Sequence, residues 1–335
     1  MSGLKGRHLL SLRDYKQSEL MLIFATTRKL REMAVRGEVF RPLSGKTLGM
    51  VFLQQSTRTR ISFETAIYQL GGHGICLSGR ELHLSRGESM GDTARVLSGY
   101  LDAIMIRTHR HQDVEEMAAK ASIPVINGLT DKYHPCQALT DFYTILAKKG
   151  RLRGLKLSYV GDGNNNVTHS LLLGAAKLGV NIHIAAPTGY EPDPQIMALA
   201  LSEAQLSGSS LMVGTDPIAA VAGADVVYTD VWVSMGREAQ GKERLRDLTP
   251  YQVNTGLLSR AKPDAIFLHC LPAKRGQEVT DAVLDGPNSA VFDQAHNRLH
   301  VQKALLYLLL RGEGLGGEIE QNLDRGELSR AVGLT

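Results

Sequence analysis

Short apolar runs alternate with longer helical patterns along most of this chain of 335 residues. The runs lie at residues 48–53, 74–77, 103–106 and 124–127, and then at 155–160, 180–185, 210–213, 225–229, 265–268 and 290–292. Short apolar strands that alternate with amphipathic helices are typical of parallel β-sheets covered by helices on both faces. The sequence therefore predicts an α/β protein with doubly wound parallel sheets.

The apolar runs form two series, which predicts two domains. A chain of 335 residues is also too long for one ordinary hydrophobic core. The break is best placed at residues 148–154, a polar segment that contains two glycines and follows a long helical pattern. The predicted domains are therefore residues 1–149 and 150–302.

The amino-acid composition excludes several classes of protein. Apolar residues make up 43% and charged residues 21%, and no apolar run reaches the ~18 to 20 residues of a membrane span. The first residues lack the apolar core and cleavage site of a signal peptide, so we predict a cytoplasmic protein without a membrane partner. Cys76, Cys136 and Cys270 have the spacing of neither a disulfide framework nor a metal site.

The net charge of +4 is a mild excess of positive charge. Its densest basic cluster, residues 107–111, could be interpreted as a nucleic-acid patch. The cluster has no interleaved aromatic residues and lies at the end of a predicted strand, so a small anionic substrate explains it better. We predict no nucleic-acid partner.

The segment STRTR at residues 56–60 follows the first apolar run and precedes a helical pattern that includes Phe63, Ile67 and Leu70. Free N–H groups at the helix start, the helix dipole, the hydroxyl groups and Arg58 can converge there on a phosphate. A serine helix cap followed by solvated arginines is the alternative interpretation. The segment predicts an oxyanion site.

Two further segments lie where an apolar run ends. HPCQ at residues 134–137 follows the run at 124–127, and HCLP at residues 269–272 follows the run at 265–268. Each contains a proline that restricts the backbone, and Pro135 can also be the first residue of the next helix. Because ligands bind beyond the carboxyl ends of strands in open parallel sheets, these segments are expected to face ligands.

These three segments resemble the carbamoyl phosphate signatures of the aspartate/ornithine carbamoyltransferase family, in the same order and with matching separations. A fourth segment, DVWVSMG at residues 230–236, resembles the ornithine-binding loop of the ornithine branch of that family. The resemblance covers about residues 8–310. It implies two doubly wound domains with the active site in the cleft between them, and a closing helix, about 303–320, that packs back on the first domain.

The resemblance also implies the reaction and the partners. The carbamoyl group of carbamoyl phosphate is transferred to the δ-amino group of L-ornithine, which gives L-citrulline and phosphate in arginine metabolism, without a metal or cofactor. Such a transfer needs a clamp on the phosphate, donors toward the carbonyl oxygen, orientation of the carbamoyl NH2 and a neutral amine.

The implied binding residues for carbamoyl phosphate are Ser56, Thr57, Arg58, Thr59, His83, Arg107, His134, Gln137, Cys270, Leu271 and Arg298. Residues 56–59 hold the phosphate, and Arg107 contacts both the phosphate and the carbonyl oxygen. His134 and Arg298 donate toward the carbonyl oxygen. Gln137 and the backbone carbonyl groups of residues 270 and 271 accept from the NH2 group. From the residues alone, His134 could instead be a structural histidine and Arg298 a surface arginine.

The implied ornithine site comprises Asn166, Asp230, Ser234 and Met235. Asp230 pairs with the α-amino group, Ser234 contacts the same end of the substrate, and Asn166 binds the α-carboxylate. Three consecutive asparagines leave the register at residues 164–166 ambiguous by one. Cys270 is implied to lie nearest the δ-amino group, although a buried small apolar role would also suit it.

His83 occupies a position where many family members carry glutamine. The resemblance implies that this loop reaches the phosphate of a neighbouring subunit, and hence a homo-oligomer that is a trimer or a multiple of trimers. Histidine can bring a charge to that contact, whereas glutamine cannot.

Parts of the sequence are also compatible with three other functions. A dinucleotide-dependent oxidoreductase would use the turn at residues 161–166, but the third glycine position of GxGxxG holds Asn166. A non-catalytic sensor of carbamoyl phosphate is a minor option. A carbamoyltransferase for putrescine or an N-modified ornithine is the main alternative within the family. The direction of the reaction is left open by the sequence.

Overall fold

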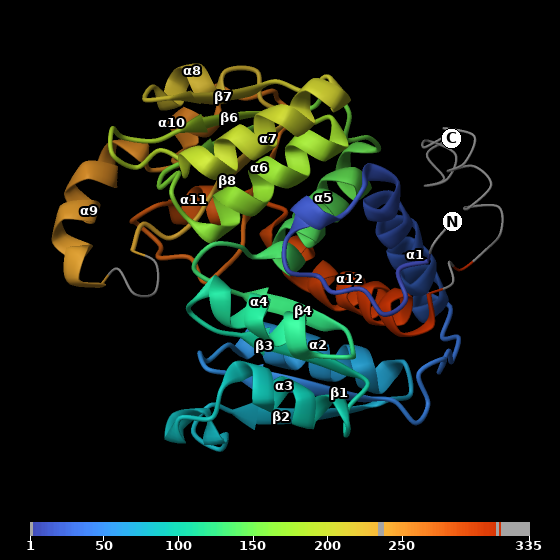
Figure 1. Cartoon of the computed structure of the whole chain (residues 1–335). Coiled ribbons are helices and arrows are strands. Elements are labelled where there is room, and N and C mark those ends of the chain that lie inside the picture. The colour runs from blue at the N-terminus through green and yellow to red at the C-terminus, as the bar shows by residue number, and fades with distance from the viewer. Residues whose placement is uncertain (1–2, 234–237, 313–314, 316–335) are drawn as a thin grey trace. The chain divides into compact units, whose positions relative to one another are not determined.

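The computed structural model of the chain describes residues 3–233, 238–312 and 315 (Figure 1). The contacts of the described residues define two units: one holds the residues up to Leu139 and those from Asn297 onward, and the other holds the residues between Thr140 and His296. Helix α5 (Pro135–Lys149) and helix α12 (Val291–Arg311) each contribute residues to both units. The domain boundaries predicted from sequence, at 149/150 and near 302, stay a prediction.

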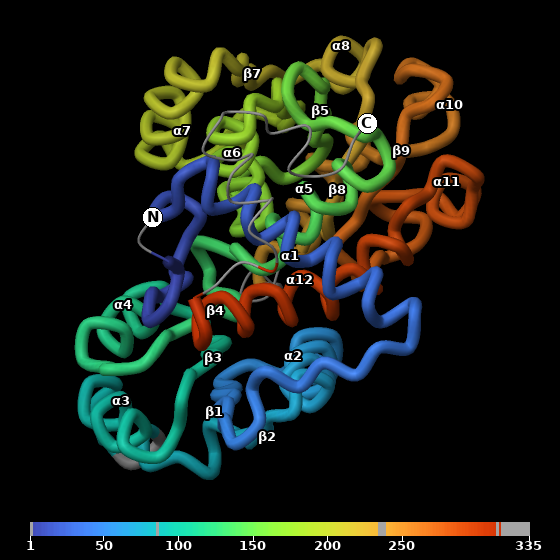
Figure 2. Tube along the Cα trace, turned by 90° about the vertical axis from the view of Figure 1, so that its right-hand side faces the viewer, coloured from blue at the N-terminus to red at the C-terminus, as the bar shows by residue number. Residues whose placement is uncertain are grey.

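The first unit contains a parallel sheet of four strands in the order β2-β1-β3-β4. Besides parts of α5 and α12, its elements are α1 (Gln17–Val35), β1 (Thr47–Phe52), α2 (Thr57–Gln69), β2 (His73–Ser78), α3 (Met90–Ser98), β3 (Ala103–Arg107), α4 (His111–Lys120) and β4 (Val125–Leu129). Val51 and Ile106 pack in one core cluster with Met117 of α4. On the other side, Met50 and Ile67 of α2 both approach Gly74. Helices therefore cover both faces of this sheet, and Figure 2 shows α2 along β1 and β2.

The second unit contains a parallel sheet of five strands in the order β7-β6-β5-β8-β9. Its strands are β5 (Lys156–Val160), β6 (Asn181–Ala185), β7 (Leu211–Gly214), β8 (Val226–Thr229) and β9 (Ile266–His269). Its helices are α6 (Asn166–Leu178), α7 (Pro194–Ser207), α8 (Pro217–Val221), α9 (Gly241–Leu248), α10 (Thr255–Leu258) and α11 (Asp281–Leu284). Helices α6 and α7 lie side by side, and α6 is buried from Val167 to Leu178 (Figure 1).

Each sheet has a point where the strand order reverses. In the first unit, β1 lies between β2 and β3, so strands are added on both sides of β1. In the second unit, β5 lies between β6 and β8 in the same way. Crevices at the carboxyl ends of such strand pairs are where open α/β sheets bind ligands. Ligand sites are therefore expected at the segments after β1 and β3 and at those after β5 and β8.

The parallel α/β fold predicted from the apolar runs is confirmed, and nine of the ten runs correspond to strands within one or two residues. The tenth prediction, a strand at residues 290–292, is wrong. Backbone hydrogen bonds join Phe267 to Asn288 and Ala290, but they form only an isolated β-bridge and no strand. Helix α12 begins at the next residue, Val291. A run of three apolar residues does not distinguish a strand from the buried start of a helix.

Among the helices in the described part of the chain, none combines the length and the apolar character that crossing a membrane requires.

Candidate active site

The predicted oxyanion segment lies at the strand reversal of the first unit. Helix α2 begins at Thr57, and Ser56 is its N-cap, with its Oγ accepting the N–H of Thr59 at 3.2 Å. Arg58 is half-buried in the first turn. The positive end of the helix dipole and a guanidinium group thus come together at the carboxyl end of β1, which suits an anion.

Arg107 ends the neighbouring strand β3. Phe52 lies opposite Arg107 in the β1–β3 register, and the N–H of Leu53 donates to the Arg107 carbonyl at 2.9 Å. The Arg107 side chain is only 7% exposed. The sheet register therefore places this buried cation beside the segment that leads into α2.

A direct hydrogen-bonded chain links three predicted site residues that are far apart in sequence. Arg298 of α12 donates from Nη1 to Gln137 Oε1 at 2.6 Å and from Nη2 to Thr59 Oγ1 at 3.3 Å. Arg298 is 3% exposed, so this is not a surface arginine. Pro135 is the first residue of α5, as predicted, and it places Gln137 in the first turn of that helix. The Gln137 amide oxygen is therefore held by the buried Arg298 guanidinium group.

His134 precedes α5 and is buried. Burial lowers the pKa of His134 well below its ordinary value of 6.5, and the positive charges of Arg298, Arg107 and Arg58 lower it further. The imidazole is therefore neutral near pH 7, with one N–H donor and one acceptor nitrogen. Three cations around a neutral donor form a region suited to a dianionic phosphate and an attached carbonyl oxygen.

The lowered pKa of His134 gives a testable pH dependence of stability. Above pH 6.5 the group is neutral in both the folded and the unfolded chain and contributes nothing. Below 6.5 the unfolded chain binds a proton that the folded chain excludes, so stability falls with decreasing pH by up to ~1.4 kcal/mol per pH unit. In His134→Gln, the free energy of unfolding from chemical denaturation is expected to fall less steeply from pH 6.5 to pH 5. Equal slopes in both proteins would contradict the neutral state assigned to His134.

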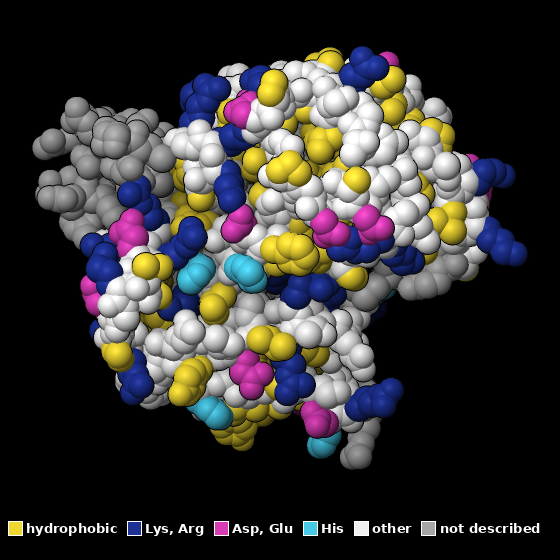
Figure 3. Space-filling view, turned by 180° about the vertical axis from the view of Figure 1, so that it is seen from behind, with side chains coloured by type: hydrophobic (Ala, Val, Ile, Leu, Met, Phe, Trp, Pro, Cys, Tyr) yellow, Lys and Arg dark blue, Asp and Glu magenta, His cyan; other side chains and the backbone are white. Residues whose placement is uncertain are grey.

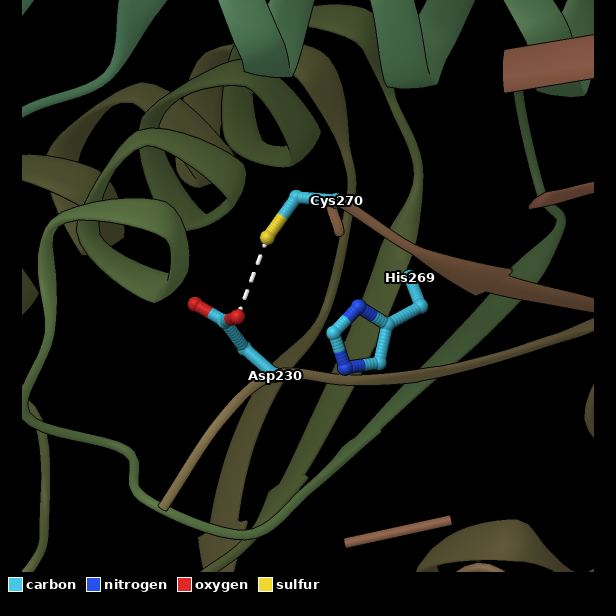
Figure 4. Close-up of side chains that lie close together, drawn as sticks. All are labelled: Asp230, His269 and Cys270. Atoms are coloured by element: carbon cyan, nitrogen blue, oxygen red, sulfur yellow. Dashed lines mark hydrogen bonds between the residues drawn. The ribbon is translucent and has the colours of Figure 1, made fainter. Parts of the chain in front are cut away.

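The second unit places a carboxylate at its own strand reversal. Asp230 directly follows β8, is 7% exposed, and accepts at Oδ1 from the thiol of Cys270 at 3.0 Å and from the N–H of Val231 at 2.8 Å (Figure 4). A compact, hydrogen-bonded carboxylate at a ligand-binding edge is suited to an ammonium group. The Cys270 thiol is thus a hydrogen-bond donor to Asp230 in the structure, and its role toward the δ-amine stays a prediction.

The asparagine segment follows β5 at the same reversal. Asn165 is the N-cap of α6: its Oδ1 accepts from the N–H groups of Val167 and Thr168, and its Nδ2 donates to Tyr159 Oη and the Asp162 carbonyl. Both ends of the Asn165 amide are therefore used by the protein. Asn165 therefore has a structural role at the start of α6, and the predicted role of Asn166 stays a prediction.

The Cys270 segment is supported by His269. The His269 Nδ1 accepts the N–H of Leu271 at 2.9 Å, and Nε2 lies 3.2 Å from Glu278 Oε1. Leu271 has a left-handed backbone with φ of 57°. Both ring nitrogens of His269 thus help to hold the backbone next to Cys270, a role that sequence reasoning did not assign to it.

Potential ligand atoms of Asp230, His269 and Cys270 lie within 4.8 Å of one another (Figure 4). The donor set does not fit a resident metal as it stands, because His269 Nδ1 already accepts from Leu271 and Nε2 is paired with Glu278. The thiol is also directed at Asp230 rather than shared with the imidazole. The geometry is that of a hydrogen-bonded network, and the absence of a metal stays a prediction.

The structure says little or nothing about three of the predicted site residues. His83 lies in the short helix η2 (His83–Arg86) after β2, and its side chain is exposed. Ser234 and Met235 lie outside the described residues. Their predicted roles stay predictions.

The basic cluster at residues 107–111 does not form one charged surface. Arg107 is buried, Arg110 pairs with Asp113 at 2.5 Å, and His111 Nδ1 lies 3.1 Å from Thr130 Oγ1. On the face shown in Figure 3, basic and acidic side chains are interspersed. The structure therefore gives no support to the nucleic-acid interpretation.

The dinucleotide interpretation meets a physical obstacle. A cofactor phosphate at the start of α6 would need N–H groups of the first turn, and Asn165 already binds those of Val167 and Thr168. The backbone at Gly163 is also closely covered, because an added Cβ would lie 2.7 Å from the Tyr190 carbonyl oxygen.

Both halves of the chain match known family models. Residues 7–147 match the carbamoyl-P binding domain of aspartate/ornithine carbamoyltransferase, and residues 153–309 match the Asp/Orn binding domain. An ornithine carbamoyltransferase from Thermococcus kodakarensis is 56% identical over 310 residues, covering 92% of this chain and 98% of the relative. One from Bacillus subtilis is 55% identical over 313 residues, covering 93% and 97%.

The chain is also similar to a solved structure from this family. Ornithine carbamoyltransferase from Pyrococcus furiosus superposes with a TM-score of 0.90 at 52% identity, covering 93% of this chain and 100% of that one. Together with the two matched domains, this similarity extends over nearly the whole length of both proteins. The chain belongs to the aspartate/ornithine carbamoyltransferase family.

Proposed function

We propose that this chain transfers the carbamoyl group of carbamoyl phosphate to the δ-amino group of L-ornithine, giving L-citrulline and phosphate. The observation that carries the choice of ornithine is the buried Asp230 carboxylate, bound by the Cys270 thiol at the strand reversal of the second unit. The name ornithine carbamoyltransferase, borne by relatives that are 53–56% identical, supports it.

In the proposed mechanism, the first unit binds and polarises carbamoyl phosphate. The start of α2 with Ser56, Thr57, Arg58 and Thr59 holds the phosphate, and Arg107 spans the phosphate and the carbonyl oxygen. His134, as a neutral donor, and Arg298 stabilise the negative charge that develops on that oxygen. Gln137 accepts from the carbamoyl NH2, as do the backbone carbonyl groups of Cys270 and Leu271.

The second unit binds the amino acid in the proposed mechanism. Asp230 pairs with the α-ammonium group and Asn166 with the α-carboxylate, which fixes the end of ornithine that does not react. Ser234 and Met235 are proposed to contact the same end. Holding the α-groups directs the neutral δ-amine to the carbamoyl carbon, where the new C–N bond forms. The C–O bond to the phosphate breaks, and the leaving phosphate takes its electron pair and the proton that the nitrogen loses.

A panel of amines tests this assignment. Product formation from carbamoyl phosphate is measured with L-ornithine, putrescine and an N-modified ornithine, each at several concentrations. Ornithine is expected to have the highest kcat/KM, because putrescine lacks both groups that the proposed amine site binds. Faster turnover of putrescine or of the modified ornithine would replace the assignment by the main alternative.

The direction of the reaction is proposed to be synthesis of citrulline. A 53% identical relative from Pyrococcus furiosus carries the name "Ornithine carbamoyltransferase, anabolic". Comparing the rate of citrulline formation with the rate of its phosphorolysis, at equal substrate concentrations, tests this proposal.

The chain is further proposed to form a homo-oligomer based on trimers, in which His83 reaches the phosphate of a neighbouring subunit. Ile75 is exposed on the edge strand β2, and Ile61 and Tyr68 are exposed on α2, which packs against that strand; these apolar side chains support an interface between copies. His83 lies five residues after the end of β2 and is exposed in the single chain.

Subunit mixing tests the shared site. Arg58→Ala and His83→Ala are each expected to be severely impaired, and equal amounts are allowed to exchange subunits. In a head-to-tail ring, a site is intact only if its own subunit is the His83 variant and the neighbour is the Arg58 variant. Random mixing makes about one quarter of the sites intact, so activity is expected to rise to about that fraction. Activity that stays at the average of the two variants, despite demonstrated exchange, would place His83 outside the neighbour's site.

A further inference from the structure

Arg244 is a buried arginine on the short helix α9, and its side chain is only 4% exposed. Its Nε donates to the backbone carbonyl of Trp232 at 2.7 Å, and its Nη2 forms a buried ion pair with Asp162. Its guanidinium carbon also lies 4.9 Å from the centre of the Tyr190 ring. One guanidinium group therefore contacts three separate loops of the second unit.

Two of these loops carry proposed ornithine ligands. Trp232 is two residues after Asp230, and Asp162 begins the turn that leads to Asn166. The carboxylate of Asp162 accepts the N–H of Asn164 at 3.1 Å, and its backbone carbonyl accepts from Asn165 Nδ2 at 2.7 Å. The position of Asp162 is thus coupled to the position of the asparagine segment.

The same loops pack closely against one another. An added Cβ at Gly161 would lie 3.6 Å from the indole nitrogen of Trp232, and one at Gly163 would lie 2.7 Å from the Tyr190 carbonyl oxygen. The turn at 161–166 is therefore covered on both sides by the loops that Arg244 contacts. The contacts of Arg244 and the close packing independently indicate that these loops adopt one fixed arrangement.

We propose that Arg244 is a positioning residue for the amino-acid substrate. It holds the segment after Asp230 in register with the turn that carries Asn166, so that the groups for the α-ammonium and the α-carboxylate are at a fixed spacing. Arg244 acts through these residues and does not touch the substrate. This inference rests on the proposed ornithine carbamoyltransferase function.

The chemistry of the contacts requires arginine. A guanidinium group offers several N–H donors in a fixed plane, so it can bond the Trp232 carbonyl and the Asp162 carboxylate at once while stacking on a ring. A lysine keeps a positive charge beside Asp162, but its ammonium group cannot reproduce this planar set of N–H donors. Arg244→Lys is therefore expected to remove the bonds that fix the spacing of the loops. The buried Asp162 carboxylate keeps a cationic neighbour in this variant.

The test compares Arg244→Lys with the unmodified protein in steady-state assays and in binding of L-norvaline. L-norvaline has the α-groups of ornithine but no δ-amine, so it reports on the α-end alone. The KM for ornithine and the inhibition constant of L-norvaline are each expected to rise by about 10-fold or more, in parallel. The dissociation constant of carbamoyl phosphate is expected to stay within about twofold.

A matched control separates positioning from a loss of stability. The buried Lys177 of α6 forms another ion pair of the second unit, at 2.8 Å, with the half-buried Glu203 of α7. Lys177→Met is expected to lower the free energy of unfolding while changing the ornithine KM by less than about twofold.

Asp162→Asn weakens the ion pair between Arg244 and Asp162 by changing the other partner. This variant is expected to raise the ornithine KM as Arg244→Lys does.

The outcomes distinguish the inference from the function on which it rests. If the unmodified protein does not carbamoylate ornithine, the proposed function is wrong. If it does, the inference is overturned by an unchanged ornithine KM in Arg244→Lys, by an equal loss of carbamoyl phosphate binding, or by an equal rise in KM for Lys177→Met.

Discussion

Arg58→Ala is expected to lower kcat/KM for carbamoyl phosphate by roughly 30- to 1000-fold, which corresponds to a loss on the order of 2 to 4 kcal/mol of transition-state stabilisation. Arg58 lies in the first turn of α2, beside the buried Arg107 and the neutral His134. Negative charge on the phosphate grows as the bond to the carbamoyl group breaks, so a charge-assisted contact there is strongest in the transition state.

Arg60 provides a matched control for this prediction. It is exposed on the same helix and pairs with Glu64 at 3.5 Å, one turn further along. Arg60→Ala removes the same charge from α2 and is expected to change kcat/KM by less than about threefold. Equal losses in the two variants would show that only the overall charge of the helix matters, and a near-normal Arg58→Ala would remove Arg58 from the site.

Asp230→Asn is expected to raise the KM for ornithine by roughly 30- to 160-fold, on the order of 2 to 3 kcal/mol, with carbamoyl phosphate binding kept. Asparagine preserves the shape of the side chain, and its oxygen can still accept from the Cys270 thiol. What is lost is the negative charge expected to face the α-ammonium group in a buried position.

The exposed Asp264, which pairs with Lys149 at 3.0 Å, provides the control for a general loss of negative charge in the second unit. Asp264→Asn is expected to leave the ornithine KM within about twofold. An unchanged KM in Asp230→Asn would exclude the pairing of Asp230 with the α-ammonium group. A parallel loss of carbamoyl phosphate binding would show that the substitution disturbs more than the amine site.

Much of the fold could be predicted because its determinants are local. Nine of the ten apolar runs form strands, Pro135 begins α5 as predicted, and Ser56 caps α2, as the alternative interpretation of that segment expected. Each of these signals acts within one turn or one strand. The run at 290–292 failed because a helix start and a short strand look alike over three residues.

The candidate site was predictable only in part. Strand ends could be located, and parallel strands end together, so the segments after β1, β3, β5 and β8 could be expected at ligand-binding edges. The bond from Arg298 to Gln137 joins residues 161 positions apart, and no periodicity or turn signal encodes such a pairing. The resemblance supplied Arg298, whereas from the pattern alone it could equally be a surface arginine.

Arg244 and the pair His269 and Glu278 were missed for the same reason. Arg244 lies in a strongly polar helix, which predicts a solvated side chain, and its partner Asp162 is 82 positions away. His269 was recognised only as part of a motif. Its role in supporting Leu271 becomes visible once the distance to Glu278, nine residues further on, is known.

A protein that fixes the α-end of ornithine delivers the carbamoyl carbon to the δ-nitrogen and not to the α-nitrogen. NMR spectroscopy tests this on the product formed from carbamoyl phosphate labelled with carbon-13 and ornithine labelled with nitrogen-15 at the δ-position only. We expect a one-bond coupling between the labelled carbon and the labelled nitrogen in all of the product. A carbamoyl carbon without that coupling, which would place it on the α-nitrogen, or the absence of any carbamoylated ornithine would contradict the proposed function.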